Sequence, residues 1–150
     1  MQLLVSWQSN ASRRCMPSLL SEPLWLPYEV VVSYNLNAVT ETGENHALLF
    51  HGKLEGALLR PYNSWRYESN NDVVSLGVLY MEAIAQAHAF EQGNKRTGFD
   101  AGFVFMYTNG WELTEDADQE LVAVAFLEII ERTRTTASFE DYLKNYIQPL

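Results

Sequence analysis

From Leu24 to the C-terminus, apolar residues recur at intervals of three and four, and short polar breaks separate the runs. That spacing places apolar side chains on one face of a helix, so each run predicts an amphipathic helix. No repeat, coiled-coil heptad or low-complexity tract is present. The pattern therefore predicts an all-α fold, a bundle of about six helices.

The first two predicted helices are bounded by proline, glycine and asparagine. The first begins at Pro27, a residue that suits the first turn of a helix, and ends before Gly43. The second begins at a cap on Asn45 and stops before Pro61. The polar, aromatic stretch RPYNSWRYESNN, residues 60–71, then predicts a loop or small flap of the kind that often carries recognition. The alternative for it is an exposed connection whose aromatic side chains fold back on the core: Tyr62, Trp65 and Tyr67.

Four more helices follow from caps and breaks further along the chain. One begins at a cap on Asp72, and after a tight turn the next runs from about Lys95 to a stop at Asn109-Gly110. Another starts at Thr114, because the acidic residues that follow it complement the helix dipole. The last, short helix begins at Ser138, which has the spacing of a capping box.

Composition narrows the classes of function. The chain has 150 residues, the size of one domain, and 19 acidic against 10 basic residues give it a formal charge of -9. A net negative charge does not favour general binding to nucleic acid or to an anionic membrane. No run of apolar residues has the length of a membrane span. The single cysteine, Cys15, excludes an internal disulfide and fits a reducing compartment. We therefore expect a cytoplasmic protein with neither nucleic acid nor membrane among its partners.

Residues 1–22 have no clear periodicity and no readable function. They are either a disordered lead or an overlong start, with Met16 as the true beginning. Arg13 and Arg14 resemble a twin-arginine export signal, but two prolines and a glutamate interrupt the apolar core that should follow. We therefore divide the chain into an unassigned lead, 1–22, and one domain, 23–150.

The segment HAFEQGNKRTGF, residues 88–99, combines a histidine, a glycine turn and two adjacent cations. The first amide protons of the helix that begins near Lys95 lack partners within the helix, and the helix dipole favours an anion there. Gly93 allows close approach of the backbone, and Asn94 offers both donors and an acceptor. Arg96 adds a rigid fork of donors and Lys95 a mobile charge. The turn is therefore a candidate phosphate site.

His88 precedes this turn, within reach of a group that binds there. A histidine can accept a proton from an attacking hydroxyl near neutral pH, so the combination predicts phosphoryl or nucleotidyl transfer. The segment has neither the Walker spacing nor a GxGxxG pattern. The alternative is a histidine at a helix end, a glycine turn and two solvated cations. No second histidine is expected near the turn.

Five residues of the segment stand at the spacing of the HPFx(D/E)GNGR motif of Fic proteins: His88, Phe90, Gly93, Asn94 and Arg96. GNKRT is similar to the death-on-curing (Doc) branch of that family, and the likeness covers about residues 24–114. The resemblance implies a helical Fic fold that transfers part of a nucleotide to a protein hydroxyl. Most Fic enzymes move AMP from ATP, whereas the Doc toxin moves the terminal phosphate onto elongation factor Tu and is restrained by a small antitoxin.

The resemblance also implies a role for each matching residue. These roles are general base for His88, core anchor for Phe90, phosphate nest for Gly93 and Asn94, and phosphate contact for Arg96. Lys95 stands in place of a small residue, where it would crowd the pose for AMP transfer and favour transfer of the terminal phosphate. ATP, with magnesium, is the expected cofactor.

Two residues depart from the motif. Ala89 replaces a common proline and removes rigidity from the loop. Gln92 stands where the family has the acidic residue that binds magnesium, and a neutral amide is a poor ligand for that ion. Glu91 is adjacent, but neighbouring residues in a tight turn point in different directions. The metal ligand therefore stays unknown.

Three further sequence patterns are interpreted as structural features with no catalytic or metal-binding role. TETGEN, residues 40–45, fits the [S/T]xxxE[G/N] string of self-inhibited Fic proteins, but its glycine predicts a loop. His46 and His51 lie five residues apart on a predicted helix, a spacing that does not suit a shared metal. Gly98 and Gly102 are expected to let two helices approach closely.

The sequence thus favours a Doc-like, toxin-type transferase that uses ATP to modify a protein hydroxyl, with phosphoryl transfer preferred over AMP transfer. Gln92 is expected to weaken its activity. The expected partners are a protein substrate, by resemblance a translation factor, and a small antitoxin. The alternative is a catalytically inactive Fic-fold module that binds a protein partner.

Overall fold

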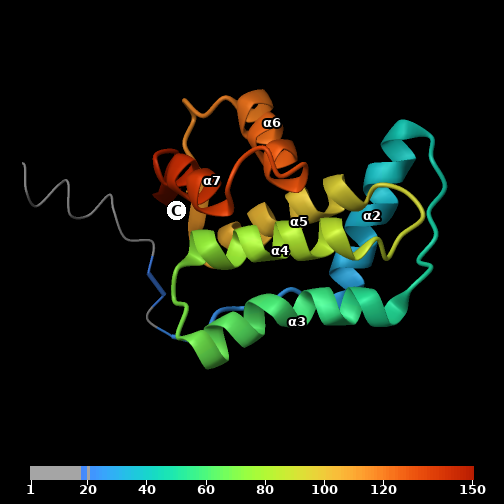
Figure 1. Cartoon of the computed structure of the whole chain (residues 1–150), viewed down its shortest axis with the longest axis horizontal. Coiled ribbons are helices and arrows are strands. Elements are labelled where there is room, and N and C mark those ends of the chain that lie inside the picture. The colour runs from blue at the N-terminus through green and yellow to red at the C-terminus, as the bar shows by residue number, and fades with distance from the viewer. Residues whose placement is uncertain (1–17, 20) are drawn as a thin grey trace, which may run out of the picture.

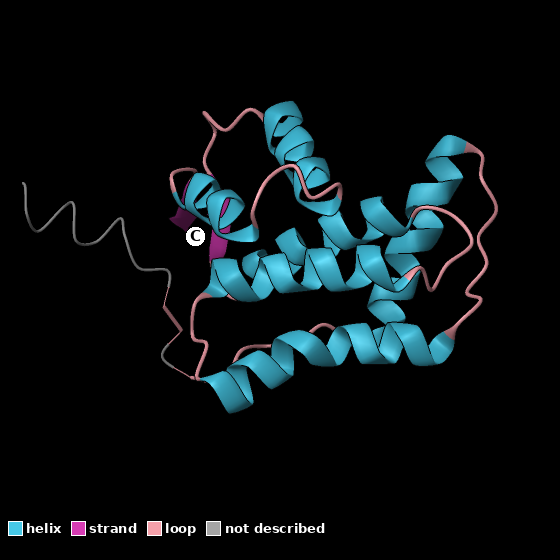
Figure 2. Ribbon diagram, viewed as in Figure 1, coloured by secondary structure: helices cyan, strands magenta, loops and turns pink. Residues whose placement is uncertain are grey.

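The computed structural model describes residues 18, 19 and 21–150, so most of the predicted lead, including its arginine pair and Cys15, lies outside the described residues. In the described part, six helices and a two-stranded sheet form the fold (Figures 1 and 2), which confirms the all-α prediction. Their order is α2 (Tyr28–Thr42), α3 (His51–Glu68), α4 (Val73–Ala87), α5 (Asn94–Thr108), β1 (Trp111–Leu113), α6 (Gln119–Ile130), α7 (Thr136–Lys144) and β2 (Ile147–Pro149). None of the described helices is both long and apolar enough to cross a membrane.

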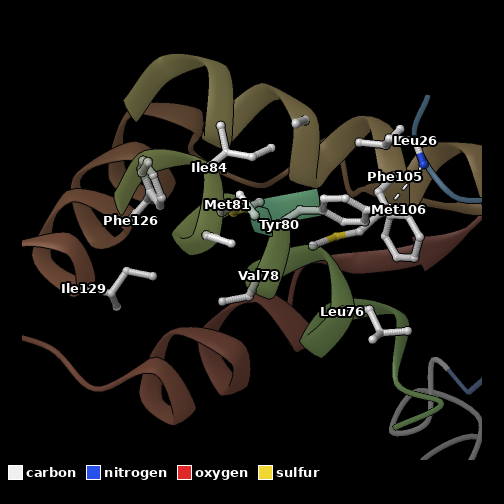
Figure 3. Packing of buried hydrophobic residues seen from close by; sticks show 14 of the residues in the cluster. Leu26, Leu76, Val78, Tyr80, Met81, Ile84, Phe105, Met106, Phe126 and Ile129 are labelled. Atoms are coloured by element: carbon white, nitrogen blue, oxygen red, sulfur yellow. Dashed lines mark hydrogen bonds between the residues drawn. The ribbon is translucent and has the colours of Figure 1, made fainter. Parts of the chain in front are cut away.

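Helix α4 is the centre of the bundle, with α3 on one side of it and α5 and α7 on others (Figure 1). Ten of its 15 residues are buried, as expected for a helix that is apolar on most of its circumference. Its Tyr80 packs on Phe105 of α5 with ring centroids 5.0 Å apart, and the Tyr80 hydroxyl accepts a hydrogen bond from the Leu26 amide (Figure 3). The core therefore forms around the α4 and α5 pair.

Close packing of α4 on α5 depends on glycine, as predicted for Gly98 and Gly102. A Cβ atom on Gly98 would lie 2.5 Å from the Met81 carbonyl oxygen and 3.1 Å from the Ala85 amide nitrogen. Gly102 and Gly77 face each other across the same contact, and no sequence pattern indicated a role for Gly77. Because the obstacle at Gly98 is main chain, the two helices could not keep this separation with any larger residue.

The predicted stop before Pro61 and the predicted flap over 60–71 are both wrong, because α3 continues to Glu68. Proline removes one helical hydrogen bond, but the apolar face continues across it. The buried positions of α3 are Leu54, Ala57, Pro61 and Ser64. The ring of Trp25 lies 5.6 Å from that of Tyr62 and 5.8 Å from that of Trp65, whereas Tyr67 is 78% exposed. Packing of two of the three aromatic residues thus outweighs the missing hydrogen bond.

Three predicted helix starts are also displaced. The second helix begins at His51, and Asn45 caps nothing because residues 44–50 are not helical. Helix α6 begins at Gln119 with a cap on Asp118, since the Thr114 amide instead donates to the Tyr146 carbonyl and extends the β1–β2 pairing. Helix α7 is capped by Thr135, whose hydroxyl accepts from the Ser138 amide. The predicted cap on Asp72 and the stop at Asn109 are confirmed.

Candidate functional site

The predicted phosphate turn is the connection between the two central helices. Helix α4 ends at Ala87, and α5 begins at Asn94. His88 follows α4 in the left-handed conformation, with φ of 49°, and Gly93 precedes α5 with φ of 74°. The His88 side chain is exposed and makes no hydrogen bond with any described residue. An exposed histidine thus lies at one end of a six-residue loop, 88–93.

Phe90 and Asn94 stabilise the conformation of that loop. The Phe90 side chain is buried in the core. The Asn94 side chain accepts a hydrogen bond from the Phe90 amide at 3.0 Å and donates one to the Phe90 carbonyl at 2.8 Å. Both polar groups of Asn94 are therefore engaged by main chain, so its side chain shapes the loop.

Gly93 is required by its surroundings as well as by its backbone. A Cβ atom there would lie 3.0 Å from Cγ1 of Val39 and 3.2 Å from Nδ2 of Asn35, both on α2. The Gly93 carbonyl accepts from the Thr97 amide at 2.9 Å and from the Thr97 hydroxyl at 2.7 Å. The turn is thus seated directly on α2, which no part of the motif indicates.

The two cations of the motif lie at the start of α5, and both are exposed. The Arg96 guanidinium forms an ion pair with the carboxylate of Glu41, in the last turn of α2. Asp100 lies one turn after Arg96 on α5; burial raises its pKa, Arg96 opposes the rise and Glu41 adds to it. The arginine predicted to contact phosphate is therefore paired with a carboxylate of the protein itself.

The string TETGEN, residues 40–45, was predicted to form a loop, and it does so only in part. Its first three residues are in α2, and Gly43 ends the helix with φ of 72°. The glutamate at the string's fixed position is Glu44, and its carboxylate accepts from the Thr42 hydroxyl at 2.6 Å. The carboxylate that reaches the motif is that of Glu41.

A short extended segment, residues 46–50, pairs with the loop and is here called the flap strand. Leu48 and Phe90 form an antiparallel bridge. The Leu49 and Phe50 amides donate to the Ala89 carbonyl, and the Glu91 amide donates to that of Ala47, at 2.8 to 3.1 Å. In Figure 1 the two segments are the neighbouring connections at the end of the bundle beside α2. Sequence reasoning missed this strand because its leucines also fit a helical stripe.

His46, at the start of the flap strand, lies beside the loop, so the prediction of no second histidine near the turn is wrong. Its ring centroid is 6.2 Å from that of Phe90, and its Nδ1 is 2.8 Å from Oδ1 of Asn35. His51 bonds instead to the Tyr28 hydroxyl, with Nδ1 and the oxygen 2.6 Å apart. The two histidines thus have different partners.

Residues near the loop do not by themselves make a metal site. Glu91 and Gln92 are both exposed. Among residues 18, 19 and 21–150, no three side chains of histidine, cysteine, aspartate or glutamate cluster closely enough to hold a metal ion. The glycine turn, its amide groups and the two cations fit a nucleotide phosphate, whereas a magnesium ion finds no ready carboxylate set here.

The fold and the site together define a helical bundle whose central helix pair is joined by a glycine turn with a histidine on one side and two cations on the other. The chain belongs to the Fic/DOC family, whose sequence profile matches residues 25–106, from before α2 into α5. It is also similar to "Protein kinase doc" of Escherichia phage P1. The two are 24% identical over 92 residues, which are 61% of this chain and 72% of that protein.

Proposed function

We propose that this protein is a Doc-like transferase that uses ATP to modify a hydroxyl group of another protein. Membership of the Fic/DOC family supports the class of reaction, and the similarity to a protein named as a kinase supports phosphoryl transfer. The observation that carries the proposal is the loop 88–93, with an exposed histidine at one end and a glycine turn that leads into Lys95 and Arg96 at the other.

His88 accepts the proton of the attacking hydroxyl, whose oxygen forms a bond to phosphorus as the bond to the leaving phosphate oxygen breaks. The amide groups at the start of α5 bind phosphate oxygens, because they have no partner within the helix. Lys95 and Arg96 neutralise the charge of the phosphates and hold them in line. ATP supplies the transferred group and the leaving group.

Magnesium, when bound with ATP, neutralises further charge on the phosphates. With Gln92 in place of an acidic ligand, the nucleotide and water would supply most of the ion's ligands. We therefore expect the transfer to need an unusually high magnesium concentration. The proposed partners are a protein substrate, with a translation factor as the first candidate, and a small antitoxin.

Labelled ATP tests the reaction and its direction. Lys95 stands where the Fic motif has a small residue, and it therefore favours a pose of ATP in which the terminal phosphate faces the hydroxyl. Incubated with cell lysate and magnesium, the protein should transfer label to a protein band from γ-labelled ATP and not from α-labelled ATP. The reverse pattern would replace phosphoryl transfer by AMP transfer.

A second candidate function is that of an inactive module that binds a protein partner. It is favoured by the outer face of α6, which exposes three large apolar side chains to solvent: Leu121, Val124 and Leu127. Apolar side chains grouped in this way often mark an interaction surface. Absence of label from both forms of ATP, with no binding of ATP, would favour this candidate over the transferase.

A further inference from the structure

Asn35, in the middle of α2, joins four parts of the site through one side chain. It is completely buried. Its Nδ2 donates to the Gln92 carbonyl at 2.8 Å and to the Thr97 hydroxyl oxygen at 3.1 Å, while its Oδ1 lies 2.8 Å from Nδ1 of His46. The amide thus connects α2 with the loop, with α5 and with the flap strand.

The partners determine the direction of every bond in this network. The Gln92 carbonyl can only accept, so the amide nitrogen of Asn35 must face it and the amide oxygen must face His46. That oxygen also only accepts, so Nδ1 of His46 carries a proton and donates. Thr97 donates its own hydroxyl proton to the Gly93 carbonyl. The result is a directed chain from His46 through Asn35 and Thr97 to Gly93.

These hydrogen bonds fix the direction of two carbonyl groups of the turn. The described residues contain no cis peptide bond, so in each peptide unit the N–H points away from the C=O. Because the Gln92 carbonyl faces Asn35, the Gly93 N–H faces away from α2. Because the Gly93 carbonyl points along α5 to the Thr97 amide and hydroxyl, the Asn94 N–H points the opposite way, off the N-terminal end of the helix. These are the amide protons that a phosphate would meet.

We propose that Asn35 is a positioning residue that orients the turn so that its amide groups face the nucleotide phosphates. A buried side chain that donates to the Gln92 carbonyl prevents the peptide from rotating and presenting that oxygen to an anion. The effect on ATP rests on the proposed function, whereas the bond directions rest on the geometry alone. Asn35 also stands at the spacing of the buried face of α2, with Val31 and Val39 four residues away on either side.

The chain offers a matched control on the same helix, because Asn37 is exposed. Titration calorimetry with ATP and magnesium should show about tenfold weaker binding for Asn35→Ala and unchanged binding for Asn37→Ala. Tyr80→Phe removes a buried hydrogen bond in the middle of α4, outside the loop, and so controls for a general loss of stability. Wild-type affinity in a folded Asn35→Ala protein would overturn the proposal.

Two NMR measurements separate this proposal from the function on which it rests. If the wild-type protein does not bind ATP, the proposed function fails, and the role of Asn35 is then decided without nucleotide. We expect His46 to be protonated at Nδ1, and we expect Asn35→Ala or Asn35→Asp to shift the Gly93 amide resonance strongly. Asn35→Asp keeps the acceptor for His46 and removes the donor to Gln92, so it should leave the protonation at Nδ1 unchanged. Protonation of His46 at Nε2 alone, or an unshifted Gly93 amide, would contradict the inference.

Discussion

At the scale of single residues, we expect the Glu41 carboxylate to compete with phosphate for the Arg96 guanidinium. Its guanidinium pairs with Glu41, and both side chains are about half exposed, so the pair is weak and can exchange for a phosphate. Glu41→Gln should strengthen ATP binding by about two- to fivefold, since it frees Arg96 and removes a negative charge near the phosphates. Calorimetric titration of both proteins with ATP tests this.

Glu44→Gln is the control for this substitution, because Glu44 is exposed, its carboxylate accepts from the Thr42 hydroxyl, and the ion pair of Arg96 is with Glu41. It should leave the affinity for ATP unchanged. Equal affinity of the Glu41→Gln protein and the wild type would show that Glu41 does not compete with phosphate.

The charged form of Asp100 lowers the stability of the folded protein, and the size of this effect depends on pH. Burial raises its pKa in the folded protein, so its charged form lowers stability at neutral pH, and this cost disappears below the ordinary aspartate pKa of about 4. We therefore expect the Asp100→Asn protein to be more stable than the wild type at pH 7, with the difference shrinking as the pH falls. Urea unfolding from pH 7 to about pH 3.5 measures it. Asp116→Asn, at an exposed aspartate, should show no such trend.

At the scale of elements, the contact of α4 with α5 fixes both ends of the loop 88–93. Gly98→Ala would force a Cβ atom against the Met81 carbonyl oxygen, and we expect a loss of about 1–3 kcal/mol in the free energy of unfolding. Gly56→Ala, in an open position on α3, should instead gain about 0.5–1 kcal/mol through helix propensity. Denaturant unfolding of both proteins compares them, and an unaffected Gly98→Ala protein would contradict this account of the packing.

The elements also show what local pattern can and cannot predict. The α4 and α5 pair was predictable because a strong cap on Asp72, a glycine turn and a glycine pair all act locally. The length of α3 was not, because the packing of Trp25 on Tyr62 and Trp65 joins segments far apart in sequence. The flap strand also depends on a distant partner, since its hydrogen bonds are made to the loop.

At the scale of the whole molecule, the same distinction applies to the site. His88, Gly93 and Arg96 form one continuous segment, so the motif indicated them directly. Asn35 and Glu41 come from α2, and only the fold brings them to the loop. The one sequence sign of Asn35 was that this polar residue lies at the spacing of the apolar positions of its helix. No local pattern indicated the partner of Arg96. The account of the site therefore combines a motif from one segment with supports from another.

The central claim is that His88 is the base in a transfer reaction, and His51 provides the matched control. Both histidines are exposed, but His51 lies at the start of α3 and bonds to Tyr28. Transfer of label from γ-labelled ATP to a protein target should fall about 10²- to 10⁴-fold in the His88→Ala protein and stay at the wild-type rate in the His51→Ala protein. A His88→Ala protein that labels its target at the wild-type rate would contradict the account.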